Sequence, residues 1–517
     1  MRGAPCRGGF AKCHEGRSTM NTRFDAVIVG LGPVGAVLAA LLGQEGLDVA
    51  VLERSHEVYP LPRAAHYDHE IMRVFQRVGI AQEALAHSRP AGAYEFRNAA
   101  GELLMAARRG DEQGASGWAF AYMFNQPGVE RALRARLTQM PNVSMHMGQT
   151  FRSQVQHADH VEVLADGDNG ETVRLEARFL IGCDGAWSPV RESLGVALED
   201  YKFDEPWLVV DTIPLDPAQM PTANLQICDP ARPTTCVQMG PGRHRWEFML
   251  LPGEETEAVL KPGFVEDLIS DWGVDVEIER RAVYRFHGLI ADRWRDGRVL
   301  IAGDAAHQMP PFAGQGMCSG IRDAANLAWK LTSVLKIGAN SDLLDSYQAE
   351  RDRSVRDYIE LAIEMGRVVC TLDPVLAAQR DAAMLASMQA NAIASPPPVG
   401  GPGKQGGIFV AGDPLAGTIF PQPVSVDGLR LDDALDGRAW LIDRLGGESA
   451  SDLRYIAASD PLIAPFRTAL EAWLEENRVE AVLVRPDRYI YGAGRADALL
   501  SSWRAALAAD VALQTVV

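Results

Sequence analysis

The residues with the clearest chemical signature form a glycine-rich turn near the start of the chain. Gly30, Gly32 and Gly35 have the spacing G-x-G-x-x-G, and Glu53 ends the next apolar segment. Such glycines let a pyrophosphate approach a helix N-terminus, and a carboxylate there accepts hydrogen bonds from a ribose diol. The pattern predicts a site for an adenine dinucleotide without choosing between FAD and NAD. The alternative is a glycine-rich turn in an unrelated α/β protein.

Two later turns carry aspartates at the ends of apolar segments. Asp304 lies in the turn Gly303–His307, where a carboxylate can bind the hydroxyls of a ribityl chain, and this favours a flavin. The segment 310–316 follows and opens a helix, whose first N–H groups can stabilise negative charge on a reduced ring. Asp184 lies in Cys183-Asp184-Gly185, which taken alone is equally typical of a simple β-turn.

These turns need strands and helices to hold them together. Residues 26–29 read as a buried strand, 34–42 as a helix and 48–53 as a second strand, which makes a βαβ unit. Residues 178–186 and 298–307 repeat the form of an apolar strand followed by a turn. We expect all three turns to meet at the edge of one sheet.

The rest of the chain divides by its periodicity. Residues 200–285 alternate in a way typical of an antiparallel sheet, and 319–394 have helical periodicity. Residues 396–407 are rich in proline and glycine and are predicted to be a linker. Residues 408–517 suffice for one compact α/β domain, and residues 1–20 are predicted to be a disordered extension.

Composition narrows the function. The net charge of −18, from 50 basic and 68 acidic residues, repels phosphate backbones, so no nucleic-acid partner is expected. The seven cysteines contain no C-x-x-C pair, which indicates a cytoplasmic protein with neither a disulfide framework nor a metal site. The uncharged stretch 26–43 is interrupted by glycines and Pro33, so no membrane partner is expected either.

The chain resembles the single-component, class A flavoprotein aromatic hydroxylases. The resemblance rests on GLGPVG, ERSHEVYPLPRAAHYDHE, CDGAWSPVR and GRVLIAGDAAHQMPPFAGQG and covers nearly the whole chain. NLQICDPARPTTCVQMGPGRHRWEFMLLPGE and VLVRPDRY are most similar to 3-(3-hydroxyphenyl)propionate hydroxylases. The resemblance implies a Rossmann-like FAD-binding unit at 21–395, with an inserted antiparallel substrate sheet at about 90–120 and 200–288. It also implies a thioredoxin-like domain without redox cysteines at 408–517.

The resemblance also implies roles for single residues. Cys318 stands where relatives usually have asparagine, so the usual side-chain hydrogen bond at that helix start is in doubt. The implied FAD-binding residues are Gly30, Gly32, Gly35 and Glu53 for the ADP part, Arg63 for the pyrophosphate, Gln126 and Asp304 for the ribityl region, Asp184 for both FAD and NAD(P)H, and Gly314, Gly316 and Met317 for the pyrimidine side.

The implied reaction is the hydroxylation of a phenol. NADH or NADPH, binding transiently, reduces a tightly bound, non-covalent FAD, and O₂ supplies the oxygen placed ortho to the phenol. The expected substrate resembles a 3-hydroxyphenylpropanoate, as in aromatic catabolism, and a homodimer is expected. The catalytic candidates are His66, Tyr122, His307 and Pro311, and for the first three a structural role is the stronger alternative.

Four residues of the predicted substrate sheet are further candidates. Arg232 and Arg245 are candidates for pairing with a substrate carboxylate, with local ion pairs as the alternative. Trp207 and Trp246 are candidates for lining an aromatic pocket, and core packing explains them equally well.

Other flavin functions remain open at the sequence level. One is a halogenase or another non-hydroxylating FAD enzyme, although the W-x-W-x-I-P signature of flavin halogenases is absent. Another is a flavin-binding redox sensor whose C-terminal domain docks a partner. Phenol-stimulated oxidation of NADH or NADPH distinguishes the hydroxylase from both.

Overall fold

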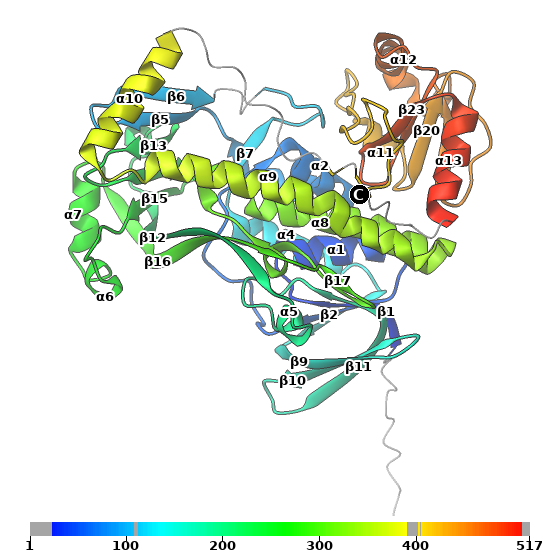
Figure 1. Ribbon diagram of the computed structural model, residues 1–517, viewed down its shortest axis with the longest axis horizontal. Helices are drawn as coiled ribbons and strands as arrows, with labels where there is room; N and C mark the ends of the chain where they lie inside the picture. The colour runs from blue at the N-terminus through cyan, green and yellow to red at the C-terminus, as the bar shows by residue number, and fades with distance from the viewer. Residues whose placement is uncertain (1–22, 108–111, 390–401, 404, 509–517) are drawn as a thin grey trace, which may run out of the picture.

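A computed structural model describes residues 23–107, 112–389, 402–403 and 405–508 (Figure 1). The predicted extension at 1–20 and residues 396–401 and 404 of the predicted linker lie outside the described residues. Among the helices of the described part, none combines the length and apolar character needed to cross a membrane.

The first layer is a largely parallel sheet with the order β17-β18-β11-β1-β2-β8, and a β9-β10 hairpin extends from β11. β1 lies between β2 and β11, and β18 pairs with β11, so the three predicted strands share one sheet. The strands are β1 (Arg23–Val29), β2 (Val49–Glu53), β8 (Val143–Met147), β9 (Gln149–Gln156), β10 (Val161–Gly167), β11 (Thr172–Gly182), β17 (Arg295–Asp296) and β18 (Val299–Ile301).

Helices cover this sheet and bury β1, whose residues Ala26–Val29 are at most 5% exposed. Pro33 begins α1 after Gly32, where its missing N–H costs no hydrogen bond. Figure 1 shows α9 running across the molecule toward α10. The helices are α1 (Pro33–Gln44), α2 (His69–Val78), α3 (Ala81–Ala86), α4 (Gln126–Leu137), α5 (Pro189–Ser193), α8 (Gly316–Thr332) and α9 (Asp345–Val369).

The second layer is a mainly antiparallel sheet with the order β19-β16-β12-β15-β14-β13-β5-β6. Its central strands alternate between two buried faces, one against the first layer and one against α6 and α7. Its elements are β5 (Tyr94–Asn98), β6 (Leu103–Ala107), β12 (Leu198–Pro214), β13 (Asn224–Cys228), β14 (Thr234–Gln238), β15 (His244–Met249), β16 (Val276–Ala291), β19 (His307–Gln308), α6 (Thr256–Val259), α7 (Phe264–Ser270) and α10 (Pro374–Gln389).

A small sheet with the order β3-β7-β4 lies between the two layers, and short helical turns connect larger elements. The strands are β3 (His66–Asp68), β4 (Ser88–Pro90) and β7 (Ala121–Phe124). The short turns are η1 (Pro217–Gln219), η2 (Gly303–Ala305), η3 (Pro311–Ala313), η4 (Ser333–Ile337), η5 (Ser341–Leu344) and η6 (Pro461–Phe466).

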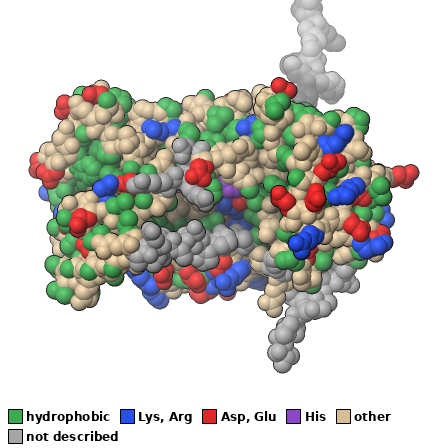
Figure 2. Space-filling model, turned by 90° about the horizontal axis from the view of Figure 1, so that it is seen from above, with side chains coloured by type: hydrophobic (Ala, Val, Ile, Leu, Met, Phe, Trp, Pro, Cys, Tyr) green, Lys and Arg blue, Asp and Glu red, His purple; other side chains and the backbone are tan. Residues whose placement is uncertain are grey.

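The C-terminal region forms a mixed sheet with the order β21-β20-β22-β23, in which β22 runs against the others. Buried ion pairs join it to the rest of the chain, including Arg485–Glu350 (2.7 Å) and Arg73–Asp432 (2.6 Å). Its elements are β20 (Ala439–Asp443), β21 (Leu453–Ala457), β22 (Ala481–Val484), β23 (Ile490–Gly494), α11 (Leu431–Ala434), α12 (Arg467–Glu476) and α13 (Ala496–Ala508). Figure 2 shows charged side chains gathered over this end of the molecule.

Candidate active site

The glycine-rich turn is packed tightly on one side and open on the other. A Cβ on Gly30 (φ +100°) would overlap the carbonyl oxygen of Cys183, and one on Gly35 would overlap that of Gly30. A Cβ on Gly32, the residue just before α1, would meet no protein atom within 4 Å. The turn therefore leaves free space in front of a helix N-terminus, where backbone N–H groups favour an anionic ligand.

Glu53 is held beside this turn. Its Oε2 accepts a hydrogen bond from the backbone N–H of Leu31 (2.8 Å), and its Oε1 accepts one from Ser55 (2.9 Å). These two bonds orient the carboxylate at the end of β2 and leave further lone pairs available.

The two predicted aspartates each have unused acceptor capacity. Asp184 accepts a hydrogen bond from the N–H of Val190 through Oδ2 (3.0 Å), whereas its Oδ1 is buried without a partner. Asp304 makes no hydrogen bond within the described part of the chain and is exposed, yet the surrounding protein desolvates it enough to raise its pKa. An accessible carboxylate with no hydrogen bond to the described residues is suited to bind hydroxyl groups.

Gln126 and Arg63 meet at the N-terminus of α4. The Oε1 of Gln126 accepts hydrogen bonds from the backbone N–H groups of Arg63 (2.9 Å) and Ala64 (2.6 Å), and its Nε2 donates to Glu130 (2.6 Å). The Arg63 side chain is exposed and lies over the ring of Tyr59. In this structure Gln126 thus fixes the loop that carries Arg63.

The loop before α8 brings Pro311, Gly314, Gly316 and Met317 together with His66. His66 Nδ1 lies 3.1 Å from the carbonyl oxygen of Gly314, and burial lowers the pKa of this histidine. Gly314 has φ +63°, which favours glycine. The first N–H groups of α8, which begins at Gly316, lie in the same loop.

Cys318 is fully buried in the first turn of α8. Its Sγ lies 3.9 Å from the carbonyl oxygen of His66 and 3.8 Å from that of Gly314, distances at which a thiol hydrogen-bonds only weakly. The N-cap residue Gln315 makes no side-chain capping bond. The backbone N–H groups of this helix start are therefore left for other partners.

Tyr122 and His307 are buried within packed networks. The Tyr122 hydroxyl accepts a hydrogen bond from the N–H of Ala119 (3.0 Å), and burial raises its pKa. His307 Nε2 lies 2.6 Å from Asp323, whose carboxylate also accepts the N–H of Gly303 (3.1 Å). His307 therefore supports the turn that carries Asp304.

The face of the antiparallel sheet toward these loops carries polar residues that the sequence analysis missed. Thr235 on β14 pairs with Glu247 on β15, and with Gln226 on β13. Glu247 pairs in turn with Val209 on β12. These side chains lie on one face because their positions are opposite each other in register. We call Tyr94, Gln226, Thr235 and Glu247 the polar patch.

Hydrogen bonds at the two ends of this sheet face place the polar patch against the loops that carry Pro311 and Arg63. Tyr94 donates a hydrogen bond to the carbonyl oxygen of Phe312 (3.1 Å), next to Pro311. At the other end, Arg245 donates to the carbonyl oxygens of Arg63 (2.8 Å) and Pro62 (2.5 Å). The patch therefore spans from the Pro311 loop to the Arg63 loop. The one signal for it in the sequence was a glutamate between Trp246 and Phe248 in a buried strand.

Both arginine candidates of the substrate sheet form ion pairs in the structure. Arg232 forms a two-point ion pair with Glu254 (both 2.7 Å), and Arg245 is paired with Asp211 (2.7 Å). Neither guanidinium is thus available without breaking an ion pair.

Trp207 and Trp246 point to opposite faces. Trp207 lies against Phe312 (ring centroids 5.6 Å apart), whereas Trp246 packs in the apolar cluster with α7. Of the two, only Trp207 lies beside the Pro311 loop.

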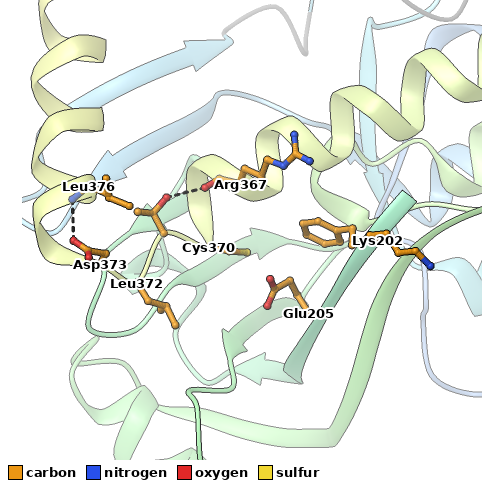
Figure 3. Close-up of a pocket in the computed structure, with 9 residues that line it drawn as sticks. Lys202, Glu205, Arg367, Cys370, Leu372, Asp373 and Leu376 are labelled. Carbon is orange, nitrogen blue, oxygen red and sulfur yellow. Dashed lines mark hydrogen bonds between the residues drawn. The ribbon is translucent and has the colours of Figure 1, made fainter. Parts of the chain in front are cut away.

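A cavity of about 350 Å³ lies behind the aromatic residues, between β12 and the junction of α9 and α10 (Figure 3). It is lined by Phe203, whose ring packs edge-on against Phe312 (6.1 Å), and by Lys202, Glu205, Arg367, Cys370, Thr371, Leu372, Asp373 and Leu376. Neither the polar patch nor the two aspartates line it. The cavity is therefore separated from the Pro311 loop by aromatic rings.

Comparison with known proteins identifies the family. Residues 23–362 match the family model described as an FAD binding domain. The chain is 39% identical, over 94% of its length and 95% of the relative's, to a probable NADH-specific resorcinol 4-hydroxylase of Rhodococcus jostii (strain RHA1). The chain belongs to the FAD-binding monooxygenase family. It is a flavin-dependent aromatic hydroxylase with FAD as its cofactor.

Other members of this monooxygenase family agree. The chain is 34% identical to a 3-(3-hydroxy-phenyl)propionate/3-hydroxycinnamic acid hydroxylase of Mycolicibacterium gilvum (strain PYR-GCK), over 92% of this chain and 90% of that one. The crystal structure of the flavin-dependent monooxygenase PieE has the same fold, with a TM-score of 0.77, 23% identity, and coverage of 94% of this chain and 99% of that one. These matches confirm the predicted family and the mixed α/β flavin monooxygenase fold.

The residues present fit FAD. The backbone at Gly32 is open to a ligand such as a pyrophosphate, because a Cβ there would meet no protein atom within 4 Å, and Glu53 is oriented toward the same turn. Asp184 has a buried oxygen without a partner, and Asp304 is an accessible carboxylate. Such a set of donors and acceptors suits a ligand with phosphate and many hydroxyl groups.

Proposed function

We propose that this monooxygenase hydroxylates a phenolic ring ortho to a hydroxyl group, with NADH as the reductant. The observation that supports this most directly is a buried polar patch directly beside Phe312 and Pro311. Two relatives carry resorcinol and 3-(3-hydroxy-phenyl)propionate in their names, and one is described as NADH-specific. When bound, FAD supplies the transfer of electrons from the nicotinamide and the activation of O₂.

We infer the FAD-binding roles from the open and unpaired groups. Gly30, Gly32 and Gly35 admit the pyrophosphate, and Glu53 binds the adenosine ribose. Asp304 binds the ribityl hydroxyls, with Asp184 behind it. Gln126 acts by fixing the loop that carries Arg63, which approaches the pyrophosphate. The start of α8, at Gly314, Gly316 and Met317, stabilises negative charge on the pyrimidine side.

The walls of the reaction site exclude water. Pro311 and Phe312 face a cluster formed by Trp207 and Phe286, whose rings lie 5.6 and 6.1 Å from that of Phe312. Because water competes for reactive oxygen species, an apolar wall here favours transfer of oxygen to the ring. We propose that His66 positions the Gly314 loop, and that His307 and Tyr122 serve as positioning residues.

The remaining predictions concern assembly. We propose that residues 408–517 form a thioredoxin-like domain, because three strands of its sheet run one way, β22 runs the other way, and α12 and α13 accompany it. The sequence has no cysteine beyond Cys370, so this domain lacks redox chemistry of its own. A homodimer and a cytoplasmic location remain proposals; the five described cysteines are all free, as a reducing compartment favours.

An oxygen-electrode assay of the FAD-loaded protein tests the function. We expect NADH oxidation and O₂ uptake to be stimulated by a phenol, with a dihydroxylated or trihydroxylated product in proportion to the NADH consumed. NADH oxidation that yields only hydrogen peroxide with every phenol would favour a non-hydroxylating flavin enzyme. A flavin spectrum that responds to redox state without turnover would favour a sensor.

A further inference from the structure

We propose that Glu247 and Thr235 accept the hydroxyl groups of the substrate, and that this pair selects an uncharged dihydroxybenzene over a phenolic carboxylate. The inference rests on the proposed function and names the substrate class for that same site. It draws on the placement of Glu247, on its missing hydrogen bonds and on the charges around it.

Glu247 lies on the sheet face between the loop of Pro311 and the loop of Arg63. It sits on β15 between Val209 and Thr235, in the middle of the sheet face that touches Phe312 at one end and the Arg63 loop at the other. The residue is 7% exposed. Glu247 is the acid of β15 on this face, so a ring bound between the two loops lies against the strand that carries it.

The Glu247 carboxylate lacks a hydrogen-bond donor among the described residues. Its nearest cation is Arg245, whose Nη1 lies 3.7 Å from Oε1. That guanidinium already donates to Asp211 and to the carbonyl oxygens of Pro62 and Arg63. A largely buried carboxylate with no protein donor gains from a hydrogen bond, and a phenolic O–H can supply that bond.

The neighbouring polar groups are oriented by one another. Thr235 Oγ1 donates to Gln226 Oε1 (2.7 Å), Gln226 Nε2 donates to the Tyr94 hydroxyl (2.9 Å), and that hydroxyl donates to the carbonyl oxygen of Phe312. Because the Thr235 proton is committed, its oxygen lone pairs are free to accept. Thr235 and Glu247 are a cross-strand pair, so two acceptors stand side by side for two hydroxyls of one ring.

The surrounding charges disfavour a substrate carboxylate. Asp211 lies between Arg245 (2.7 Å) and Arg280 (2.7 Å) and balances the pair of guanidiniums in part, and Glu247 supplies the remaining negative charge. Arg280 also donates to the carbonyl oxygen of Pro62 (2.9 Å). A substrate carboxylate that enters here would lie near Glu247 with no unpaired cation beside it. The resulting repulsion disfavours the binding of anionic phenols.

The test compares substrates and one pair of matched variants in the FAD-loaded enzyme. We expect kcat/KM for resorcinol to exceed that for 3-(3-hydroxyphenyl)propionate by about tenfold or more in the parent enzyme, because only the acid leaves a charge unpaired. Glu247→Gln should lower kcat/KM for resorcinol by about 10- to 100-fold, the value of a hydrogen bond to a charged group. In the same variant, the ratio of kcat/KM for resorcinol to kcat/KM for the acid should become smaller. A purely structural role of Glu247 would leave this ratio unchanged.

Glu279→Gln is the matched control, since Glu279 lies on β16 of the same sheet and pairs with the exposed Arg243. We expect its substrate preference to equal that of the parent, and FAD titration shows whether each variant binds the cofactor. If phenols are hydroxylated but Glu247→Gln keeps the parent preference, or the parent prefers the acid, the inference is wrong and the proposed function stands. If no phenol is hydroxylated by the parent, the proposed function itself fails.

Discussion

The two faces of the antiparallel sheet are built from the same strands and differ sharply. Leu208, Val210, Trp246 and Phe248 form an apolar face against α6 and α7. The face toward the loops of Pro311 and Arg63 carries Asp211, Arg245, Glu247 and Thr235, all less than 9% exposed. Burying polar groups costs free energy unless they are paired, whereas apolar burial is favourable. The apolar face therefore serves stability, and we infer that the polar face serves the proposed substrate site.

The largest expected effect comes from breaking the charge balance of the polar face. Asp211→Ala leaves Arg245 and Arg280 buried without their shared carboxylate, so we expect unfolding to become easier by about 3–5 kcal/mol. Denaturant unfolding with FAD present measures this. A loss no larger than that of an exposed ion pair, such as Arg243–Glu279, would contradict the assignment.

The apolar face should respond in stability alone. Trp246→Phe reduces packing against Trp272 and the α7 cluster, and we expect a loss of about 1–3 kcal/mol. The relative kcat/KM values for different phenols should stay as in the parent, because Trp246 points away from the Pro311 loop. A changed substrate preference in this variant would contradict the inference that one face serves stability and the other serves substrate binding.

Glu247→Gln should raise the stability of the folded protein and lower its activity. Burial raises the pKa of Glu247, opposed by Arg245 and Arg280 and aided by Asp211. The folded state thus holds a proton more tightly than the unfolded state, so stability falls as pH rises from the ordinary glutamate range through the raised pKa.

Because the cost of desolvating this charge outweighs its attraction to Arg245 and Arg280, removing it should stabilise the folded protein at neutral pH by up to about 2 kcal/mol, while kcat/KM falls. Thermal melts from pH 4.5 to 8 check it. The gain of the variant over the parent should grow with pH, and a constant difference would show that Glu247 does not titrate in this way.

Tyr94→Phe should have the smallest effect. It removes the hydrogen bonds to Phe312 and from Gln226, so we expect a loss of about 0.5–1.5 kcal/mol. Because the Phe312 loop loses one tether, more NADH should be consumed per product formed. Product yield per NADH, measured beside the melting temperature, separates this from a stability effect alone.

Local sequence patterns predicted the strands and turns of the first sheet well, because each of these signals depends on residues close together in the chain. The strand at 26–29, the turn at Gly30–Gly35 and Glu53 belong to one βαβ unit. Asp184 and Asp304 follow apolar segments directly, and parallel strands bring their carboxyl ends to one edge. The substrate side gave no comparable signal, since its residues come from β5, β13, β14 and β15.

Spacing and periodicity in the sequence determined the dinucleotide-type turn and the alternation of the substrate strands, because both are properties of neighbouring residues, and the resemblance to known hydroxylases indicated the family and FAD. Tertiary structure decided which side of each strand faces the loops of Pro311 and Arg63. Register pairs Val210 with Trp246 and Val209 with Glu247, so Trp246 joins the core and Glu247 faces the site. A shift of one residue would exchange the two, and only the packing of distant strands and loops fixes that register.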